Sequence, residues 1–562
     1  MNKAILKWLN SLSNKTIILK KTILLLTFLS LCFQLKAQVY FIEFSNKKSN
    51  YTLANPSAYL SNRAILRRSK QHIKTDSTDL PVVQKYVDSI AATGVKIMGK
   101  TKWLNGVLIT TQNQSALNKI YNFPFVKSHI QVKDAGKAVS QIHKFENTNS
   151  VAAISNYSND DYGFAATQIK MCNIDFLHRQ GFTGKGLQIA VLDAGFINAE
   201  NNDAFASLWN ENRIIDFYDF VHQHDSVFTD AHHGASVLSC MAVNEPTKFI
   251  GTSPDASFYL FETEDIKSEY PVEEYYWSIG AERADSAGAD LINSSLGYNW
   301  FDNAMYNHAF IDMDGKTCPA SKAATLAGSK GMIVCISAGN EGANAWYHIG
   351  TPADAKNILT VGAVNEFRNH SFFSSHGYSA DGRVKPNVCT MGENTALIDE
   401  YNNVEWGSGT SFASPLLCGM AACLWQKYPT RTALQIENAI MRSANFYTSP
   451  TDSLGYGIPD FSIADKLLAE NISAVNVSAI KPEIFPNPST ELQIFAHSNV
   501  NQNCKVSVYS IEGKLLIDES IAAYQNLNTY FKIAQATSLN KGIYLVNFKI
   551  NYITYPLKWV KM

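Results

Sequence analysis

The chain has 562 residues, more than one hydrophobic core usually spans, so we expect one large domain with smaller ones attached. Charged residues make up 17% of it and hydrophobic residues 46%, which excludes a mainly disordered protein. The net charge is -1 and no basic stripe is interleaved with aromatic residues, which argues against nucleic acid as a partner.

Residues 1–37 are predicted to be a cleaved signal peptide. Basic residues precede an apolar run at residues 23–35, and Ala37 offers a small residue for cleavage. The run is shorter than the roughly 20 apolar residues that span a bilayer, so a membrane anchor is the weaker alternative. Cys32 raises a lipoprotein alternative, which the bulky Leu31 before it disfavours.

Residues 38–132 predict a small α+β domain with the split βαβ order of a ferredoxin-like fold. The expected order is strand, helix, strand, strand, helix, strand, at residues 39–44, 81–94, 95–99, 103–111, 114–123 and 126–132. Residues 133–161 are rich in Asn and Ser and lack periodicity, so we expect an exposed linker that is open to proteolysis.

Residues 162–470 alternate short apolar strands with helical segments. Fully apolar strands separated by helices predict an α/β domain, a mostly parallel sheet with helices on both faces. Such sheets bind ligands at the carboxyl ends of their strands, where Asp193, Ser295 and Asn340 fall. Residues 479–562 change to short alternating strands and predict a small β-sandwich.

Eight of the nine cysteines lie beyond the signal segment. Cys240, Cys335, Cys418 and Cys423 have strongly apolar neighbours and are expected to be core residues. Export would permit disulfides, so the remaining four cysteines stay disulfide candidates: Cys172, Cys318, Cys389 and Cys504. Their spacing in the sequence does not determine how they would pair.

Ser411 is the first residue that predicts chemistry. In GSGTSFASP, a glycine-rich entry leads into an apolar helix whose first turn holds Ser411. The helix dipole and free N–H groups at that end favour the negative charge that develops during acyl transfer. A helix-capping serine is the simpler alternative for this residue taken alone.

His233 precedes Gly234 at the start of another apolar helix, as a rigidly held general base would. The neighbouring His232 is its rival, and the position directly before the glycine favours His233. Asp193 ends an apolar strand, where its carboxylate can accept the imidazole N–H, although turn-capping aspartates are common. Asn340 also follows an apolar strand, and its amide can donate to an oxyanion; a left-handed turn residue is the alternative.

The motifs DAG at 193, HG at 233, SAGN at 337 and GTSFASP at 409 together resemble the subtilisin-like serine peptidases, the subtilase family, over residues 162–470. The resemblance implies a catalytic triad of Asp193, His233 and Ser411, with Asn340 stabilising the oxyanion. It implies that substrate binds as an added strand between two segments. These are Ser295, Leu296 and Gly297 on one side, and Ser337, Ala338 and Gly339 on the other.

Two departures from the family pattern concern the support of the triad. Ala194 stands where a hydroxyl residue is usual, and Ala235-Ser236 stand where Thr-His is usual. We expect these changes to loosen the hydrogen bonds that orient Asp193 and His233, altering rate or pH optimum rather than abolishing activity.

The flanking regions resemble parts of the same export and maturation pathway. The α+β domain resembles the subtilase propeptide, a folding aid and temporary inhibitor, which makes the linker the maturation site. The basic pair Arg67-Arg68 lies inside the presumed propeptide. The tail, with IFPNPST and LNKGIYLVNF, resembles the C-terminal sorting domain of type IX secretion substrates. A generic β-sandwich that binds substrate or a surface polymer is the alternative for this tail.

The sequence therefore predicts an exported serine endopeptidase, secreted or held at the cell surface via the periplasm. Its expected partners are protein or peptide substrates, its own propeptide and the type IX secretion machinery. The chemistry requires no cofactor, but subtilases commonly hold structural calcium, for which Asp312 and Asp314 offer an oxygen-rich loop or merely a solvated turn. The rival hypothesis is an inactive subtilase-fold surface protein whose groove binds peptides without cutting them.

Overall fold

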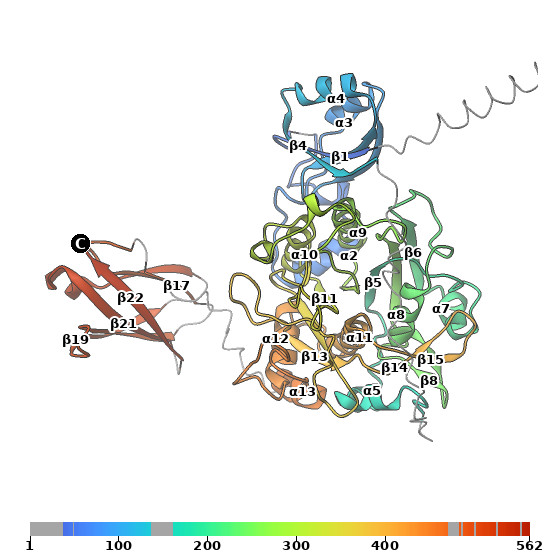
Figure 1. The fold of residues 1–562 in the computed structure, drawn as a ribbon. Coiled ribbons are helices and arrows are strands. Elements are labelled where there is room, and N and C mark those ends of the chain that lie inside the picture. The colour runs from blue at the N-terminus through green and yellow to red at the C-terminus, as the bar shows by residue number, and fades with distance from the viewer. Residues whose placement is uncertain are drawn as a thin grey trace, which may run out of the picture. The chain divides into compact units, whose positions relative to one another are not determined.

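The computed structural model describes residues 38–48, 50–135, 161–469, 483–484, 487–498, 502–523, 527–550 and 553–562. It divides into two compact units, Met1–Leu468 and Ala469–Met562, coloured blue to orange and red in Figure 1. The predicted signal peptide and most of the predicted linker lie outside the described residues. Within the described part of the chain, no helix is both long and apolar enough to cross a membrane.

The chain begins with a four-stranded antiparallel sheet in the order β2-β3-β1-β4. Its apolar core lies between the sheet and two helices, and includes Ile42, Val87, Ile109 and Leu117. The elements are β1 (Gln38–Phe44), α3 (Gln84–Ala91), β2 (Lys96–Thr101), β3 (Gly106–Thr111), α4 (Gln114–Tyr121) and β4 (Val126–Lys133). The predicted α+β region is therefore confirmed.

The larger part of this unit is a seven-stranded sheet in the order β13-β12-β11-β10-β5-β9-β6, with every neighbouring pair parallel. Its strands are β5 (Gln188–Asp193), β6 (Ile214–Asp219), β9 (Ser257–Glu262), β10 (Leu291–Ser294), β11 (Ile333–Ser337), β12 (Leu359–Val364) and β13 (Val388–Met391). The predicted α/β class with a parallel sheet is thus confirmed. The edge strands β6 and β13 were not among the predicted strands.

Helices cover both faces of this sheet (Figure 1). Alternate residues of β5 point to opposite faces, so Ile189 and Val191 pack with α8 (His233–Ala242) and α11 (Thr410–Lys427). Ala190 and Leu192 instead join the core beneath α9 (Val272–Ala287) and α10 (Pro319–Ser329). The carboxyl ends of the strands and the starts of the helices therefore lie close together at one edge of the sheet.

The remaining elements of this unit are short or lie at its periphery. They are η1 (Pro56–Ala58), α2 (Asn62–Lys70), α5 (Ala166–Met171), α6 (Asp175–His178), η2 (Asp203–Phe205), α7 (Ala206–Asn210), β7 (Asn244–Glu245), β8 (Phe249–Ile250), η3 (Ala304–Tyr306), η4 (Phe310–Asp312), β14 (Thr395–Ile398), β15 (Val404–Gly407), α12 (Ala433–Ser443) and α13 (Phe461–Ala469).

The N-terminal sheet packs its second face on the α9 layer. The Phe41 and Tyr275 rings lie 4.5 Å apart, and Leu108 belongs to the same apolar cluster as α9. Glu282 of α9 accepts hydrogen bonds from the backbone N–H groups of Lys102 at 2.7 Å and Trp103 at 2.9 Å. The two layers are therefore joined by apolar packing and by a buried carboxylate.

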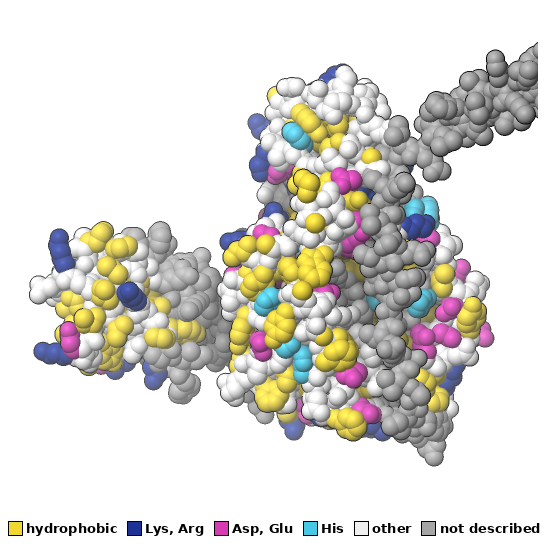
Figure 2. Space-filling view, viewed as in Figure 1, with side chains coloured by type: hydrophobic (Ala, Val, Ile, Leu, Met, Phe, Trp, Pro, Cys, Tyr) yellow, Lys and Arg dark blue, Asp and Glu magenta, His cyan; other side chains and the backbone are white. Residues whose placement is uncertain are grey.

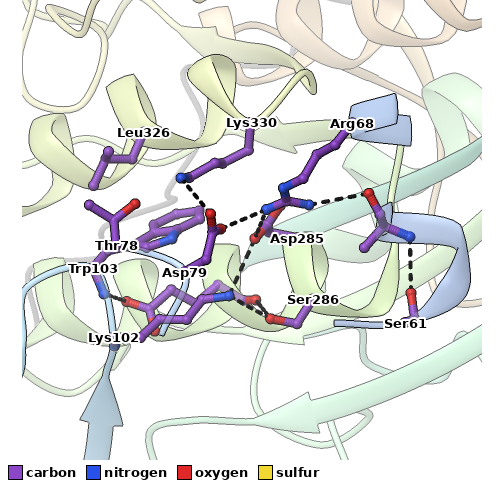
Figure 3. Close-up of polar contacts among 12 residues, drawn as sticks. Ser61, Arg68, Thr78, Asp79, Lys102, Trp103, Asp285, Ser286, Leu326 and Lys330 are labelled. Carbon is purple, nitrogen blue, oxygen red and sulfur yellow. Dashed lines mark hydrogen bonds and ion pairs between the residues drawn. The ribbon is translucent and has the colours of Figure 1, made fainter. Parts of the chain in front are cut away.

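Charged side chains make a second contact, through α2, between the N-terminal part of the chain and the helix layer that contains α9. Figure 3 shows Arg68, Asp79, Lys102 and Lys330 around Asp285. Arg68 Nη2 lies 2.8 Å from Asp285 Oδ1 and 3.0 Å from Asp79 Oδ1, and Lys330 Nζ lies 3.0 Å from Asp79 Oδ2. Except for Lys102, these side chains are at most 2% exposed, so the cluster is a buried ion network.

The second unit holds two antiparallel sheets around one apolar core that includes Val506, Val546, Phe548 and Trp559. Its strands are β16 (Glu483–Ile484), β17 (Gln493–Ser498), β18 (Gln502–Tyr509), β19 (Leu515–Ala523), β20 (Leu527–Lys532), β21 (Gly542–Ile550) and β22 (Ile553–Lys561), with η5 (Ala534–Ser538). The all-β class predicted for the tail is confirmed, and its strands pair antiparallel.

The eight cysteines of the described residues are all free and buried. The disulfide candidates Cys172, Cys318, Cys389 and Cys504 are therefore unpaired in this structure, like the four predicted core cysteines. Burial raises the pKa of the Cys172 thiol to about 12 and that of Cys504 to about 11, so both are protonated at neutral pH.

Candidate active site

The predicted acid and base meet at the carboxyl end of β5. Asp193 is the last residue of β5 and His233 the first of α8. His233 Nδ1 lies 2.6 Å from Asp193 Oδ1, and both residues are buried, with 6% and 0% exposed surface. A carboxylate on Nδ1 fixes the ring's tautomer and leaves Nε2 for proton transfer.

Gly234 explains why this pair can approach so closely. A Cβ at this position would lie 2.4 Å from the carbonyl oxygen of Gly195 and 3.1 Å from Asp193 Cβ. The Gly234 N–H donates to the Gly195 carbonyl at 3.0 Å. The glycine after His233 thus lets the start of α8 contact the turn that follows Asp193.

Ser411 lies in the first turn of α11, after the N-cap Gly409. Its hydroxyl donates to the Ser295 carbonyl at 3.4 Å, and Ser295 Oγ donates to the Ser411 carbonyl at 2.7 Å. The ring of Phe412, the next residue, lies 6.0 Å from the His233 ring. The fold therefore brings Ser411, Ser295 and His233 to one edge of the sheet.

Asn340 follows β11 and is held by the start of α11. Thr410 donates twice to Asn340 Oδ1, from its backbone N–H at 2.9 Å and from Oγ1 at 3.0 Å. The Asn340 amide nitrogen lies on the opposite side, 3.5 Å from where a Cβ on Gly409 would be. This arrangement points a donor at the entry to the helix that carries Ser411.

The two predicted substrate-binding segments follow adjacent parallel strands. Ser295, Leu296 and Gly297 come directly after β10, whereas Ser337 ends β11 and precedes Ala338 and Gly339. Gly297 is exposed, and the Gly339 N–H donates to Thr410 Oγ1 at 3.1 Å. Gly339 has a φ of 102°, a conformation that favours glycine.

The two departures from the family pattern have visible consequences. The Ala194 N–H donates to Asp193 Oδ1 at 2.8 Å, but Asp193 Oδ2 is buried and has no hydrogen-bond partner among the described residues. Ser236 Oγ contacts Glu405 Oε1 at 3.5 Å rather than Asp193. One carboxylate oxygen of the pair is thus left without the support that a hydroxyl at position 194 could give.

The predicted calcium loop uses its carboxylates internally. Asp312 Oδ2 accepts from the Ala309 N–H at 2.8 Å, and Asp314 Oδ1 accepts from the N–H groups of Lys316 and Thr317. Among the described residues, Asp312 and Asp314 belong to no group of three or more metal-ligand side chains. These hydrogen bonds favour the solvated-turn alternative.

Sequence reasoning missed a second polar cluster near this site. Asp219, His222, His224, Asp230 and Glu262 gather at the carboxyl ends of β6 and β9. The sequence signal is the density of His and Asp in DFVHQHDSVFTDAHHG, in which the predicted function used only the adjacent pair His232 and His233.

Comparison with known proteins identifies the parts of the chain. Residues 184–457 match the subtilase family, peptidase S8, and residues 39–151 match the peptidase S8 propeptide domain of Bacteroidota. Residues 483–562 match the secretion system C-terminal sorting domain, which indicates secretion to the cell surface or outside the cell.

Individual relatives are more distant. Subtilisin DY of Bacillus licheniformis is 28% identical over 296 residues, covering 51% of this chain and 93% of its own. Subtilisin amylosacchariticus of Bacillus subtilis subsp. amylosacchariticus is 29% identical over 276 residues, covering 48% of this chain and only 63% of its own. The crystal structure of MycP1 from the ESX-1 type VII secretion system shares 20% identity at a TM-score of 0.43, covering 57% of this chain and 89% of that one.

The three family matches follow one another along the chain, and the subtilase segment contains the whole seven-stranded sheet. Residues 184–457 are therefore a subtilase-family domain, with a Bacteroidota-type propeptide domain before it and a secretion-system sorting domain after it.

Proposed function

We propose that the protein is an exported serine endopeptidase that hydrolyses peptide bonds through an acyl-enzyme intermediate. The observation that carries the proposal is the 2.6 Å contact between Asp193 and His233 beside the helix start that presents Ser411. An inactive peptide-binding relative would have no need to keep this set of residues together.

In the proposed mechanism, Ser411 Oγ attacks the carbonyl carbon of the scissile bond. His233 Nε2 takes the hydroxyl proton and later gives it to the leaving amine, while Asp193 on Nδ1 stabilises the imidazolium. The Asn340 amide and the Ser411 N–H donate to the oxyanion, since N–H groups in the first turn of a helix have no intrahelical acceptor. Water then releases the acyl group by the same proton path in reverse.

The substrate is proposed to be an extended peptide that adds a strand between residues 295–297 and 337–339. Both segments leave adjacent parallel strands at the edge that carries Asp193, which supports this placement. Backbone hydrogen bonds would then give affinity, and side-chain pockets would give preference.

The N-terminal domain is proposed to act as an intramolecular inhibitor, removed by cleavage between residues 133 and 161. Its sheet is docked on α9, and Lys133 Nζ lies 2.6 Å from Asp265 Oδ2 of the subtilase domain. The tail is proposed to engage the type IX secretion machinery, so that its deletion would leave the protein in the periplasm. Normal export after deletion would contradict that role.

Fluorophosphonate labelling followed by peptide mapping tests the nucleophile directly. We expect the matured protein to carry the label on Ser411 and to lose it in Ser411→Ala, while Ser408→Ala, a nearby serine outside the triad, keeps it. Labelling elsewhere, or full peptidase activity in Ser411→Ala, would overturn the proposal. A peptide library then gives the cleavage preference.

Calcium is a separate and weaker proposal, because Asp312 and Asp314 already accept hydrogen bonds from their own turn. If calcium binds there and stabilises the fold, the unfolding temperature will fall with chelator in the wild type and not in Asp314→Asn. An equal response in both proteins would assign any calcium effect to another position.

A further inference from the structure

The cluster at the ends of β6 and β9 has the composition of a metal site. Asp219 and Glu262 are the last residues of these strands and are paired in register. His222, His224 and Asp230 come from the loop that connects β6 to α8. Five potential ligands from two strands and one loop therefore converge beside the candidate active site.

Two overlapping sets of ligand atoms are each close enough to share one ion: Asp219, His222 and His224, and Asp219, His222, Asp230 and Glu262. His222 Nδ1 lies 2.8 Å from Asp219 Oδ2, 3.3 Å from Asp230 Oδ2 and 3.9 Å from Glu262 Oε1. His224 Nε2 lies 3.2 Å from the same Asp219 oxygen. Ligands of a tetrahedral ion with bonds of about 2.0–2.2 Å lie roughly 3.4 Å apart, which falls within the range of these distances.

Asp219 is fixed in an orientation that leaves one oxygen for the cluster. Its Oδ1 accepts hydrogen bonds from the backbone N–H groups of Val221 at 2.7 Å and His222 at 2.8 Å. Oδ2 therefore faces the two imidazoles. The Asp219 side chain is 0% exposed, so its ligand oxygen is positioned by the fold rather than by solvent.

The three carboxylates lack a strong counter-charge. Among the described residues, Asp219, Asp230 and Glu262 form ion pairs only with histidines. The Glu262 side chain is 2% exposed, so solvent does little to compensate its charge. A cation bound among these carboxylates would compensate their charge.

We propose that Asp219, His222, His224, Asp230 and Glu262 bind a divalent transition-metal ion of the zinc type. Neutral imidazole combined with carboxylate suits zinc and its neighbours, whereas calcium takes oxygen ligands alone. The site is distinct from the triad and involves neither Ser411 nor Asn340. It goes beyond the peptidase proposal, and ion binding can be measured whether or not the protein cuts peptides.

The position of the site suggests what the ion does. Asp230 lies three residues before His233, and the Ala231 carbonyl accepts from the Ile197 N–H at 2.8 Å. Glu262 is paired in register with Asp193. An ion held here ties β6, β9 and the loop before α8 together, and so stiffens the support of the base.

The test uses the full chain with Ser411→Ala, which prevents self-cleavage. After chelator treatment and dialysis, zinc bound at equilibrium is measured by mass spectrometry and by competition with a chromophoric chelator. We expect the double variant His222→Asn, His224→Asn to bind one zinc ion fewer per chain than the parent. His72→Asn, an exposed histidine elsewhere, should bind as much as the parent.

Glu262→Gln guards against a folding defect, because it keeps the side chain's shape and removes a buried charge. We expect it to weaken zinc binding at least tenfold with an unchanged circular dichroism spectrum. X-ray absorption of the zinc-loaded parent should show nitrogen ligands. Equal zinc content in the parent and the double variant, or calcium displacing zinc at equal concentration, would overturn the proposal.

Discussion

Asp285→Asn tests whether the buried ion network holds the N-terminal domain on the subtilase domain. Asp285 is fully buried, and its carboxylate contacts Arg67 Nη2 at 2.5 Å, Arg68 Nη2 at 2.8 Å and Lys102 Nζ at 3.3 Å. The amide keeps the shape and removes the negative charge. Arg68 would then keep Asp79 as its carboxylate partner, whereas Arg67 would lose the one carboxylate that it pairs with among the described residues.

The expected cost follows from the burial of the cations. Removing one partner of a buried ion pair costs about 3–5 kcal/mol, because the other charge is left uncompensated. At 1.4 kcal/mol for each factor of ten, docking should weaken by about a hundredfold to several thousandfold. Glu43→Gln is the matched control, since Glu43 pairs with an exposed lysine, Lys127, and such pairs are worth about 0–1 kcal/mol.

Hydrogen exchange in α2 gives the readout. This helix has nine residues and is too short to be stable alone, so its amides are protected only while it is docked on α9. In the Ser411→Ala background, we expect Asp285→Asn to speed α2 exchange by the factor above, and Glu43→Gln by less than about fivefold. An α2 exchange rate that Asp285→Asn leaves unchanged would refute the role of the network.

Three further predictions concern pH and the support of the triad. Although burial opposes it, basic neighbours hold the pKa of Asp265 at about 2 and that of Asp285 well below its usual value. A carboxyl group whose pKa is lower in the folded state than in the unfolded state stabilises the fold at pH values above its unfolded pKa. The protection of α2 amides should therefore be constant from pH 5 to 8 and fall only below about pH 4; loss at pH 6 would contradict this. Ala194→Ser should raise kcat/KM about fivefold by giving Asp193 Oδ2 a donor worth about 1 kcal/mol, and a decrease would argue against that support. Gly234→Ala should destabilise the fold by about 1–3 kcal/mol and lower kcat, since its Cβ meets backbone at 2.4 Å; unchanged denaturation and kinetics would contradict the close contact.

The sequence predicted the parallel sheet because its central strands are continuous apolar runs. β10 and β11 are wholly buried, and such runs are typical of strands covered on both faces. β6 escaped prediction because Asp216 and Asp219 interrupt its apolar pattern. It lies at the sheet edge, where one side meets solvent and polar residues are tolerated.

The residues proposed for the triad could be selected from the sequence because each stands at a strand end or a helix start within a motif. α2 was not, since it carries three basic residues in its last turn and has no apolar stripe that signals burial. The buried basic side chains of α2 pair with Asp285, more than two hundred positions away in the chain. An ion pair at that separation leaves no local pattern, and the same holds for Asp219 and Glu262, which meet only when β6 and β9 pair.

The contacts that hold the N-terminal domain and the residues proposed for chemistry lie on different parts of the subtilase domain. Asp285, at the centre of the ion network, and Glu282 belong to α9, which covers one face of the sheet. Asp193 instead lies at the carboxyl edge of β5, and Ser411 begins α11, the helix that packs on the opposite face. The ion network therefore contributes docking energy without contacting the triad, so latency and turnover can be tuned by separate substitutions. After the proposed cleavage between residues 133 and 161, non-covalent contacts of this kind would hold the two parts together.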